Sequence, residues 1–190
     1  MAKIGLFFGS FNPIHHGHLL MATHLREAAN LDEIWLIVSP QNPFKINTQL
    51  ADEQHRYKMV EIAIRDVDWL KVSDIEFQLE KPSYTHVTLK KLLQQFTEHQ
   101  FHLIIGGDNV AKFNEWKEAQ WIQDTIPILI YQRGNVNNNG TIRNASSYSL
   151  PLLDISSTDI RKRIQENKTI RYFVPENVEQ YILFHKLFRS

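Results

Sequence analysis

His15 and His18 lie three residues apart in this 190-residue sequence, with Gly17 between them. Their types and spacing suit contact with an anion. They follow an apolar run at residues 4–8 and precede a segment of helical period at 19–29. This order predicts a strand, a loop and a helix. The free N–H groups and the dipole at a helix start favour a phosphate. The sequence therefore predicts a phosphate site, where Gly17 lets the backbone approach the ligand closely.

Closely spaced histidines are also typical of exposed surfaces and of metal sites. A zinc site needs a third and usually a fourth ligand, and this loop adds only Asn12 and His16. We therefore favour phosphate contact at His15 and His18, assign no metal-binding residues, and give His16 no role.

A second anion motif, ISSTDIR, occupies residues 155–161. Ser156 followed by Asp159 is a capping-box pattern, which by itself would stabilise the start of a helix. A capped helix start is also an anion site, so the two interpretations are compatible. Arg161 lies three residues after Thr158 on the predicted helix, which brings hydroxyls, N–H groups and a guanidinium to one side. This convergence suits a triphosphate.

The elements that must position these residues alternate along the chain. Apolar runs at 4–8, 34–38, 70–75, 103–105 and 126–131 are separated by segments of helical period at 19–29, 54–64 and 87–96, with a further one at 178–187. This pattern predicts an α/β fold, a Rossmann-like, doubly wound, mainly parallel sheet with helices on both faces. The length favours a single domain over residues 1–190.

The polar segment 134–149 predicts a surface loop or a short hairpin, to which we assign no role. Ligands of doubly wound sheets bind beyond the carboxyl ends of the strands, at the switch point of the strand order. His15, Asn42, Lys45 and Asp108 each follow the end of a predicted strand.

The composition excludes several classes of function. Lys and Arg number 21, as do Asp and Glu, so the formal net charge of +0 argues against nucleic-acid and membrane partners. The absence of cysteine excludes disulfides, zinc thiolate sites and thiol nucleophiles. The sequence shows neither a signal-type leader nor an apolar stretch near the roughly 20 residues of a membrane span. We expect a cytoplasmic protein that acts on small molecules, and a homo-oligomer is compatible with the sequence.

The HxGH element at 15–18 and the ISSTxxR element at 155–161 together resemble the nucleotidyltransferase superfamily. The chain resembles the bacterial nicotinate-nucleotide adenylyltransferases most closely. Segments 39–45, 83–89, 105–108 with Trp116, and 174–178 also match this family in order, so the resemblance runs nearly end to end. One departure is Asn12, where the family more often has aspartate. Either side chain can hold the loop by local hydrogen bonds.

The resemblance implies a transferase of NAD biosynthesis that joins nicotinate mononucleotide and ATP into nicotinate adenine dinucleotide and pyrophosphate. It implies Mg²⁺ as the cofactor, held mainly by the phosphates of ATP. The expected catalytic residues are His15, His18 and Arg161. ATP binding is expected at Gly9, Ser10, Phe11, His15, Gly17, His18, Gly106, Asp108, Ile155, Ser156, Ser157, Thr158 and Arg161. Binding of the mononucleotide is expected at Asn42, Lys45, Tyr84, Thr85 and Trp116.

Alternatives stay open at several of these positions. Asp108 is equally well interpreted as the N-cap of a helix that begins at Asn109. Thr85 fits an ordinary N-cap, and Trp116 fits a packing residue that is partly buried. Lys45 fits a solvated loop lysine. For the function, the alternatives are a nicotinamide-mononucleotide or phosphopantetheine adenylyltransferase, and a non-catalytic nucleotide-binding module.

Overall fold

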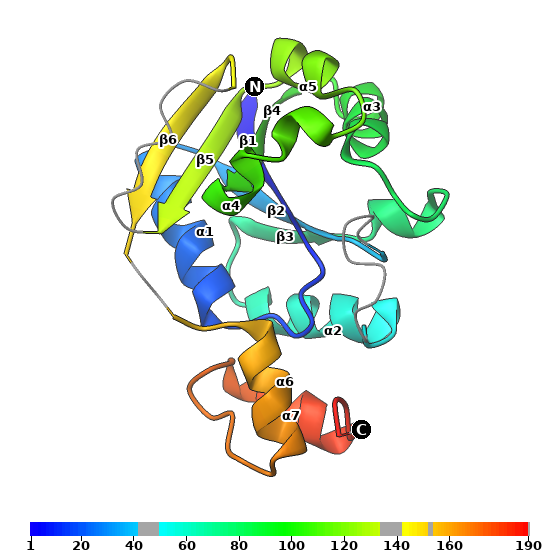
Figure 1. Cartoon of the computed structure of the whole chain (residues 1–190), viewed down its shortest axis with the longest axis vertical. Coiled ribbons are helices and arrows are strands. Elements are labelled where there is room, and N and C mark those ends of the chain that lie inside the picture. The colour runs from blue at the N-terminus through cyan, green and yellow to red at the C-terminus, as the bar shows by residue number, and fades with distance from the viewer. Residues whose placement is uncertain (42–49, 134–141, 152–153, 190) are drawn as a thin grey trace.

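The computed structural model describes residues 1–41, 50–133, 142–151 and 154–189. A six-stranded sheet of order β3-β2-β1-β4-β5-β6 forms its centre (Figure 1), and every neighbouring pair of strands is parallel. The strands are β1 (Ala2–Gly9), β2 (Glu33–Val38), β3 (Leu70–Ser73), β4 (His99–Gly106), β5 (Ile128–Arg133) and β6 (Ala145–Leu150). The helices are α1 (His16–Ala28), α2 (Glu53–Ile64), α3 (Thr85–Gln95), α4 (Gly107–Val110), α5 (Ala119–Thr125), α6 (Ser157–Gln165) and α7 (Glu176–Phe184), with short 3₁₀ helices η1 (Ile75–Gln78) and η2 (Phe113–Glu115).

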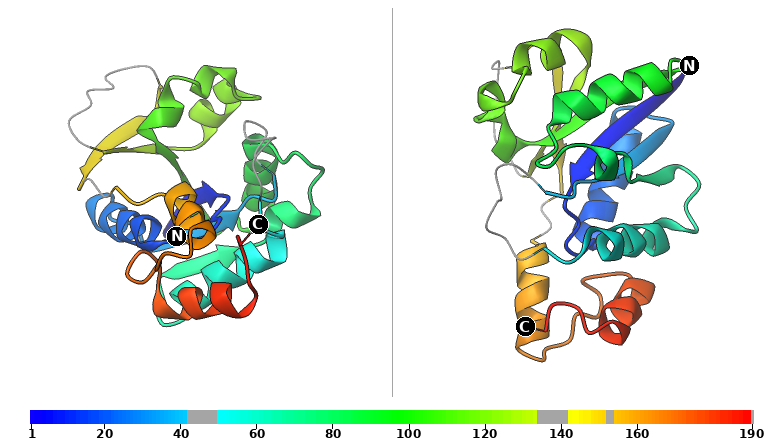
Figure 2. Two further views of the ribbon diagram at one scale, coloured as in Figure 1. Left: turned by 60° about the horizontal axis from the view of Figure 1, so that its bottom comes forward. Right: turned by 90° about the vertical axis from the view of Figure 1, so that its right-hand side faces the viewer.

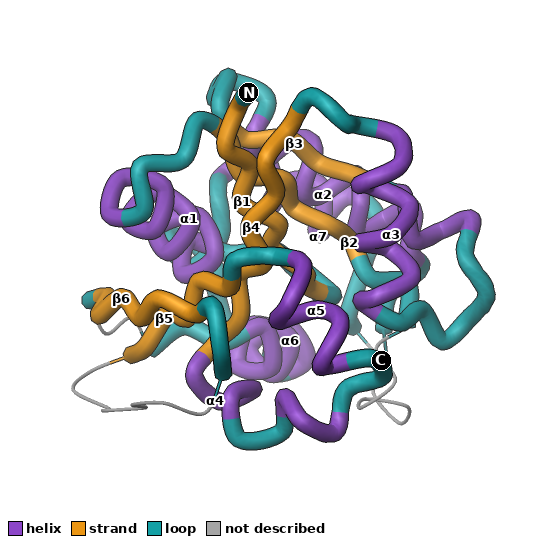
Figure 3. The backbone as a smooth tube through the Cα atoms, turned by 90° about the horizontal axis from the view of Figure 1, so that it is seen from above, coloured by secondary structure: helices purple, strands orange, loops and turns teal. Residues whose placement is uncertain are grey.

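Helices cover both faces of the sheet, because successive strand residues point to opposite sides. Phe7 of β1 joins the cluster formed by α1, α2, α6 and α7, whereas its neighbour Leu6 joins the cluster under α3, α4 and α5. Figure 3 shows α1 and α3 on opposite sides of β1 and β4. The predicted doubly wound α/β fold is therefore confirmed.

The last two helices, α6 and α7, lie beyond α1 and α2 at one end of the molecule (Figures 1 and 2). Ile160 and Ile164 of α6 and Val178 and Ile182 of α7 are buried in the same cluster as the sheet residue Phe7. This packing continues the core of the sheet into the C-terminal helices and fixes the start of α6 near the strand ends.

Part of the expected loop at 134–149 is wrong, because residues 145–149 belong to β6. This strand pairs in parallel with β5, from Ile128 opposite Ala145 to Arg133 opposite Leu150, so it is not the second arm of a hairpin. An edge strand gains its order from backbone hydrogen bonds along one side and needs no apolar run, which is why its Ser-rich sequence gave no strand signal. Residues 134–141 lie outside the described part of the chain.

The switch point of the sheet lies between β1 and β4. β1 pairs with β2 on one side, with Leu6 opposite Trp35, and with β4 on the other, with Leu6 opposite Leu103. The connections that leave β1 and β4 therefore run to opposite faces of the sheet, and a crevice opens between them. Among the helices within the described ranges, none is long and apolar enough to cross a bilayer.

Candidate active site

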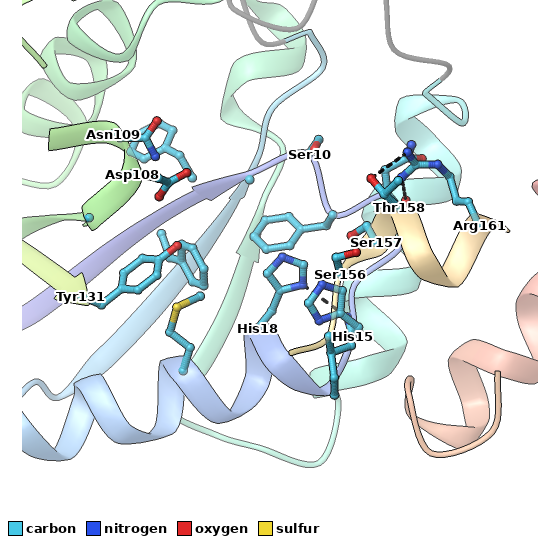
Figure 4. Close-up of a pocket in the computed structure, with 18 of the residues that line it drawn as sticks. Ser10, His15, His18, Asp108, Asn109, Tyr131, Ser156, Ser157, Thr158 and Arg161 are labelled. Atoms are coloured by element: carbon cyan, nitrogen blue, oxygen red, sulfur yellow. Dashed lines mark hydrogen bonds between the residues drawn. The ribbon is translucent and has the colours of Figure 1, made fainter. Parts of the chain in front are cut away.

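A cavity of about 1000 Å³ lies at the carboxyl ends of β1, β4 and β5. Both sequence motifs contribute to its wall, although they lie at opposite ends of the chain. Of the residues predicted to bind ATP, those lining the cavity are Gly9, Ser10, Phe11, His15, His18, Asp108, Ile155, Ser156, Ser157, Thr158 and Arg161. Figure 4 shows the imidazole rings of His15 and His18 side by side, next to Ser156 and Ser157 at the start of α6. The two motifs thus line the same cavity.

The histidine pair is built by the start of α1. His15 has extended backbone angles and caps the helix, and its ring stacks on that of His18 with 3.7 Å between the centroids. The backbone N–H of His15 donates to Nδ1 of His18 at 3.3 Å. Because a backbone N–H only donates, Nδ1 of His18 accepts, and the ring proton of the neutral imidazole is on Nε2. His18 is thereby prepared as a hydrogen-bond donor.

Gly17 leaves room for the His15 ring beside the segment that contains Ile155. A Cβ atom at this position would lie 2.9 Å from Nδ1 of His15 and 3.5 Å from the carbonyl oxygen of Ile155. Any side chain at position 17 would therefore displace the His15 ring, which is only 3% exposed. Gly17, predicted to bind ATP, is not among the described residues that line the cavity, and it lies against the His15 ring instead.

The start of α6 is fastened to the loop that follows β1. Ser156 caps the helix by accepting a hydrogen bond from the N–H of Asp159 at 3.1 Å, which confirms the predicted N-cap. Ser157 donates from its hydroxyl to the carbonyl of Pro13 at 2.9 Å. Arg161 donates to the carbonyl of Asn12 at 2.8 Å and to the hydroxyl of Thr158 at 3.3 Å. Partial burial lowers the pKa of the Arg161 guanidinium, which still stays charged near neutral pH.

Asn12 holds this loop as its side-chain chemistry predicts. Its amide oxygen accepts a hydrogen bond from the N–H of Ala51 at 3.0 Å, and its carbonyl accepts from Arg161. Asn12 is 2% exposed. The contact with Ala51 uses an acceptor oxygen, which the aspartate more often found in the resembled family would also offer.

A second cavity, of about 640 Å³, continues from the first. Both are lined by Phe7, Phe8, Gly9, Asp108, Asn109 and Tyr131. Tyr84, Thr85 and Trp116, three of the residues predicted to bind the mononucleotide, line the second cavity together. Lys117 also lines it and places its ammonium 3.7 Å from the centre of the Tyr84 ring. The second cavity thus combines aromatic surface with charged groups of both signs, since Lys112, Glu76 and Glu115 line it as well.

The structure corrects two of the capping alternatives. Asp108 is not an N-cap: α4 begins at Gly107, and Asp108 lies in its first turn. Its carboxylate folds back so closely that it would collide with a Cβ atom on Gly106. Thr85 is the first residue of α3, which is capped by Tyr84.

Some other predicted site residues lie elsewhere than the sequence indicates. Gly106, predicted with ATP, lines the second cavity. Trp116 directly follows η2 and packs partly buried against Phe113, so packing and cavity lining occur together. Asn42 and Lys45 lie outside the described residues.

Sequence reasoning missed Tyr131, which lines both cavities. A usable signal was present, because Tyr131 ends the apolar run at 126–131. Polar groups at the carboxyl ends of parallel strands are candidates for ligand contact, and the same rule applies to this tyrosine. Within the described ranges, His, Cys, Asp and Glu side chains form no group of three or more suited to a metal ion.

A cavity at the switch point of a doubly wound parallel sheet is typical of nucleotide-binding α/β proteins. Comparison with known proteins identifies the family within this class. Residues 6–163 match the family model described as "Cytidylyltransferase-like". A "Probable nicotinate-nucleotide adenylyltransferase" of Cytophaga hutchinsonii is 45% identical over 190 residues, covering 99% of each chain. The relative of the same name from Bacteroides thetaiotaomicron is 44% identical, covering 95% of this chain and 90% of its own.

A solved structure, the Plasmodium falciparum nicotinic acid mononucleotide adenylyltransferase complexed with NaAD, shares the fold with a TM-score of 0.83 at 20% identity. It covers 99% of this chain, and 98% of its own chain is matched. The chain therefore belongs to the cytidylyltransferase-like family, among its nicotinate-nucleotide adenylyltransferases. The resemblance seen in the two sequence motifs is confirmed.

Proposed function

We propose that this protein joins nicotinate mononucleotide and ATP to give nicotinate adenine dinucleotide and pyrophosphate. One observation carries the proposal at the level of residues. The HxGH and ISSTxxR segments line a single cavity, and this cavity runs on into a second one with Trp116 and Lys117 in its wall. A nucleoside triphosphate in the first cavity and a pyridine nucleotide in the second would therefore be neighbours, with their phosphates near the residues that line both cavities.

In the proposed complex, the triphosphate lies between the starts of α1 and α6. The N–H groups at both helix starts favour an anion. Nε2 of His18 donates to oxygens near the α- and β-phosphates, with His15 stacked behind it. Thr158 and Arg161 hold the β- and γ-phosphates that leave as pyrophosphate.

The reaction needs alignment more than acid–base chemistry. A phosphate oxygen of the mononucleotide attacks the α-phosphorus of ATP, the bond from that phosphorus to the bridging β-oxygen breaks, and the electron pair leaves with pyrophosphate. The attacking phosphate has a second pKa of about 6, so it is largely ionised near neutral pH. The protein then contributes by aligning the three groups and neutralising the charge that develops.

Mg²⁺ enters this scheme as part of the ATP substrate. Asp108 is the one carboxylate among the described residues that line the first cavity. Mg²⁺ in phosphoryl-transfer sites is held by substrate phosphates with one or two carboxylates, so the donor set fits an ion carried mainly by ATP. When bound, Mg²⁺ neutralises phosphate charge.

The second cavity fits an anionic pyridine nucleotide. Trp116 offers a face for stacking on the ring, and the start of α3 at Tyr84 and Thr85 offers N–H groups to a carboxylate. Lys117 adds a positive charge on the same wall. These groups favour nicotinate over nicotinamide. Asn42 and Lys45 remain predicted contacts of the mononucleotide.

Release of pyrophosphate from ATP, measured with and without each mononucleotide, tests the proposed function. We expect release only when a mononucleotide is present, with one dinucleotide formed per pyrophosphate, and a higher kcat/KM for nicotinate than for nicotinamide mononucleotide. ATP binding without turnover would contradict an enzyme. A higher kcat/KM for nicotinamide mononucleotide would reassign the substrate.

A further inference from the structure

Arg56 is a buried cation that the reaction scheme leaves without a role. It belongs to α2 and is 1% exposed. Its Nε donates to the carbonyl of Ala51 at 2.9 Å. Its two terminal nitrogens donate to three further backbone carbonyls, those of Ser10 at 2.8 Å, Ser39 at 2.6 Å and Pro40 at 2.9 Å.

These acceptors belong to the walls of the two cavities. Ser10 follows β1 and lines the first cavity, while Ser39 follows β2 and lines the second. Ser39 also donates its N–H to the carbonyl of Gly9, a residue common to both cavities. One guanidinium therefore bridges the loop on the ATP side and the loop on the mononucleotide side.

The bridge reaches the second motif through Ala51. The carbonyl of Ala51 accepts from Arg56, and its N–H donates to the side chain of Asn12. The carbonyl of Asn12 in turn accepts from Arg161. A chain of hydrogen bonds thus runs from Arg56 to the residue proposed to hold the departing phosphates.

Burial of a guanidinium is expensive for stability, and burial lowers the pKa of Arg56 against the opposing effect of Glu53 and Asp52. A core-filling role alone would suit an apolar side chain of similar volume better. The planar fork of arginine, in contrast, suits several carbonyls held at fixed angles. All four acceptors lie on segments next to the cavities.

We propose that Arg56 is a positioning residue that fixes the loops after β1 and β2 relative to each other, so that the two substrates are aligned for transfer. This inference rests on the proposed function. It places the effect of Arg56 on the rate of transfer between bound substrates, because a displacement of about 1 Å can slow an aligned reaction on the order of a hundredfold. Affinity for either substrate alone depends on other contacts.

Arg56→Lys tests this role, since it keeps the charge and loses the fork. Arg65→Lys, on an exposed arginine at the end of the same helix, is the matched control. We expect Arg56→Lys to lower the single-turnover rate about tenfold or more, while the Kd of ATP and of the mononucleotide, each measured alone, changes by less than about threefold. In Arg56→Ala, added guanidinium, but not ammonium, should restore part of the rate.

Several results would overturn the inference. Transfer at the wild-type rate by the Arg56→Lys variant would overturn it. A fall in rate that weaker binding of one substrate fully explains would also overturn it. Failure of both variants to fold would also overturn it, because Arg56 would then be needed only for the fold. Absence of transfer in the wild type would refute the proposed function as well, whereas wild-type transfer with an unchanged Arg56→Lys would refute only the role of Arg56.

Discussion

Arg161 on α6 donates a hydrogen bond to the backbone carbonyl of Asn12 at 2.8 Å, across a separation of 149 residues. Ser157 makes a parallel contact with the carbonyl of Pro13. The second motif is therefore joined to the loop of the first by the protein itself, before any nucleotide binds. The phosphate contact proposed for Arg161 would therefore come in addition to its contact with the loop.

Arg161→Lys should show whether the hydrogen-bonding geometry of Arg161 matters in addition to its positive charge. Lysine keeps the positive charge but lacks the fork that reaches both Asn12 and a phosphate. We expect kcat to fall by on the order of a hundredfold, as for the loss of one preorganised donor. Steady-state kinetics with saturating mononucleotide measure this. Lys162→Ala, the exposed neighbour on α6, is the control, and an equal loss in that variant would refute the specific role of Arg161.

Trp116→Ala should weaken binding of the mononucleotide and leave ATP binding nearly unchanged. Stacking of a base on an aromatic side chain is worth about 1–3 kcal/mol, so the Kd of nicotinate mononucleotide should rise by roughly 5- to 150-fold. Calorimetric titration with each ligand alone measures both constants. Trp121→Ala is a matched control, because Trp121 packs against the same cluster. Equal losses for both ligands in Trp116→Ala would argue against stacking.

Glu76→Gln should change how stability depends on pH. The Glu76 carboxylate is 2% exposed and accepts hydrogen bonds from the hydroxyls of Ser83 at 2.8 Å and Thr88 at 2.7 Å. Burial raises the pKa of Glu76 above its ordinary value of 4.5, and the hydroxyls oppose this only in part. The folded state therefore binds the proton more tightly than the unfolded state. The stabilising effect of this tighter proton binding is complete below pH 4.5, and it is lost as the pH rises through the raised pKa of Glu76.

The free energy of unfolding, measured in urea between about pH 4 and pH 8, tests this sign. Wild type should lose stability relative to Glu76→Gln as the pH rises through this range. Glu80→Gln, on an exposed carboxylate, should follow the wild-type curve. A Glu76→Gln curve parallel to wild type at every pH would show that the burial of the charge has no effect on folding.

Local patterns were sufficient to predict many of the residues that line the first cavity. His15, Gly17, His18 and the segment 155–161 lie at strand and helix ends, where residue type and spacing reveal the start of a helix. The sheet with helices on both faces also followed from alternating apolar runs, since parallel strands buried on both sides must be apolar.

Long-range contacts account for what the sequence could not reveal. Arg56 and Glu76 appear as ordinary charges in the sequence, and only the folded chain shows that both are buried and hydrogen-bonded. β6 is a polar edge strand whose order comes from β5, so its own residues gave no sign of it. Function here depends in part on buried polar groups whose partners are far apart in sequence.

His18→Ala in a single-turnover assay, with ATP labelled at the α-phosphate and excess nicotinate mononucleotide, tests the central claim most directly. The account predicts a folded variant that forms labelled dinucleotide on the order of a hundredfold more slowly than wild type, while His16→Ala, which changes a neighbouring histidine with no assigned role, keeps the wild-type rate. Transfer by His18→Ala at the wild-type rate would contradict the claim that the imidazole pair and α6 act on one triphosphate.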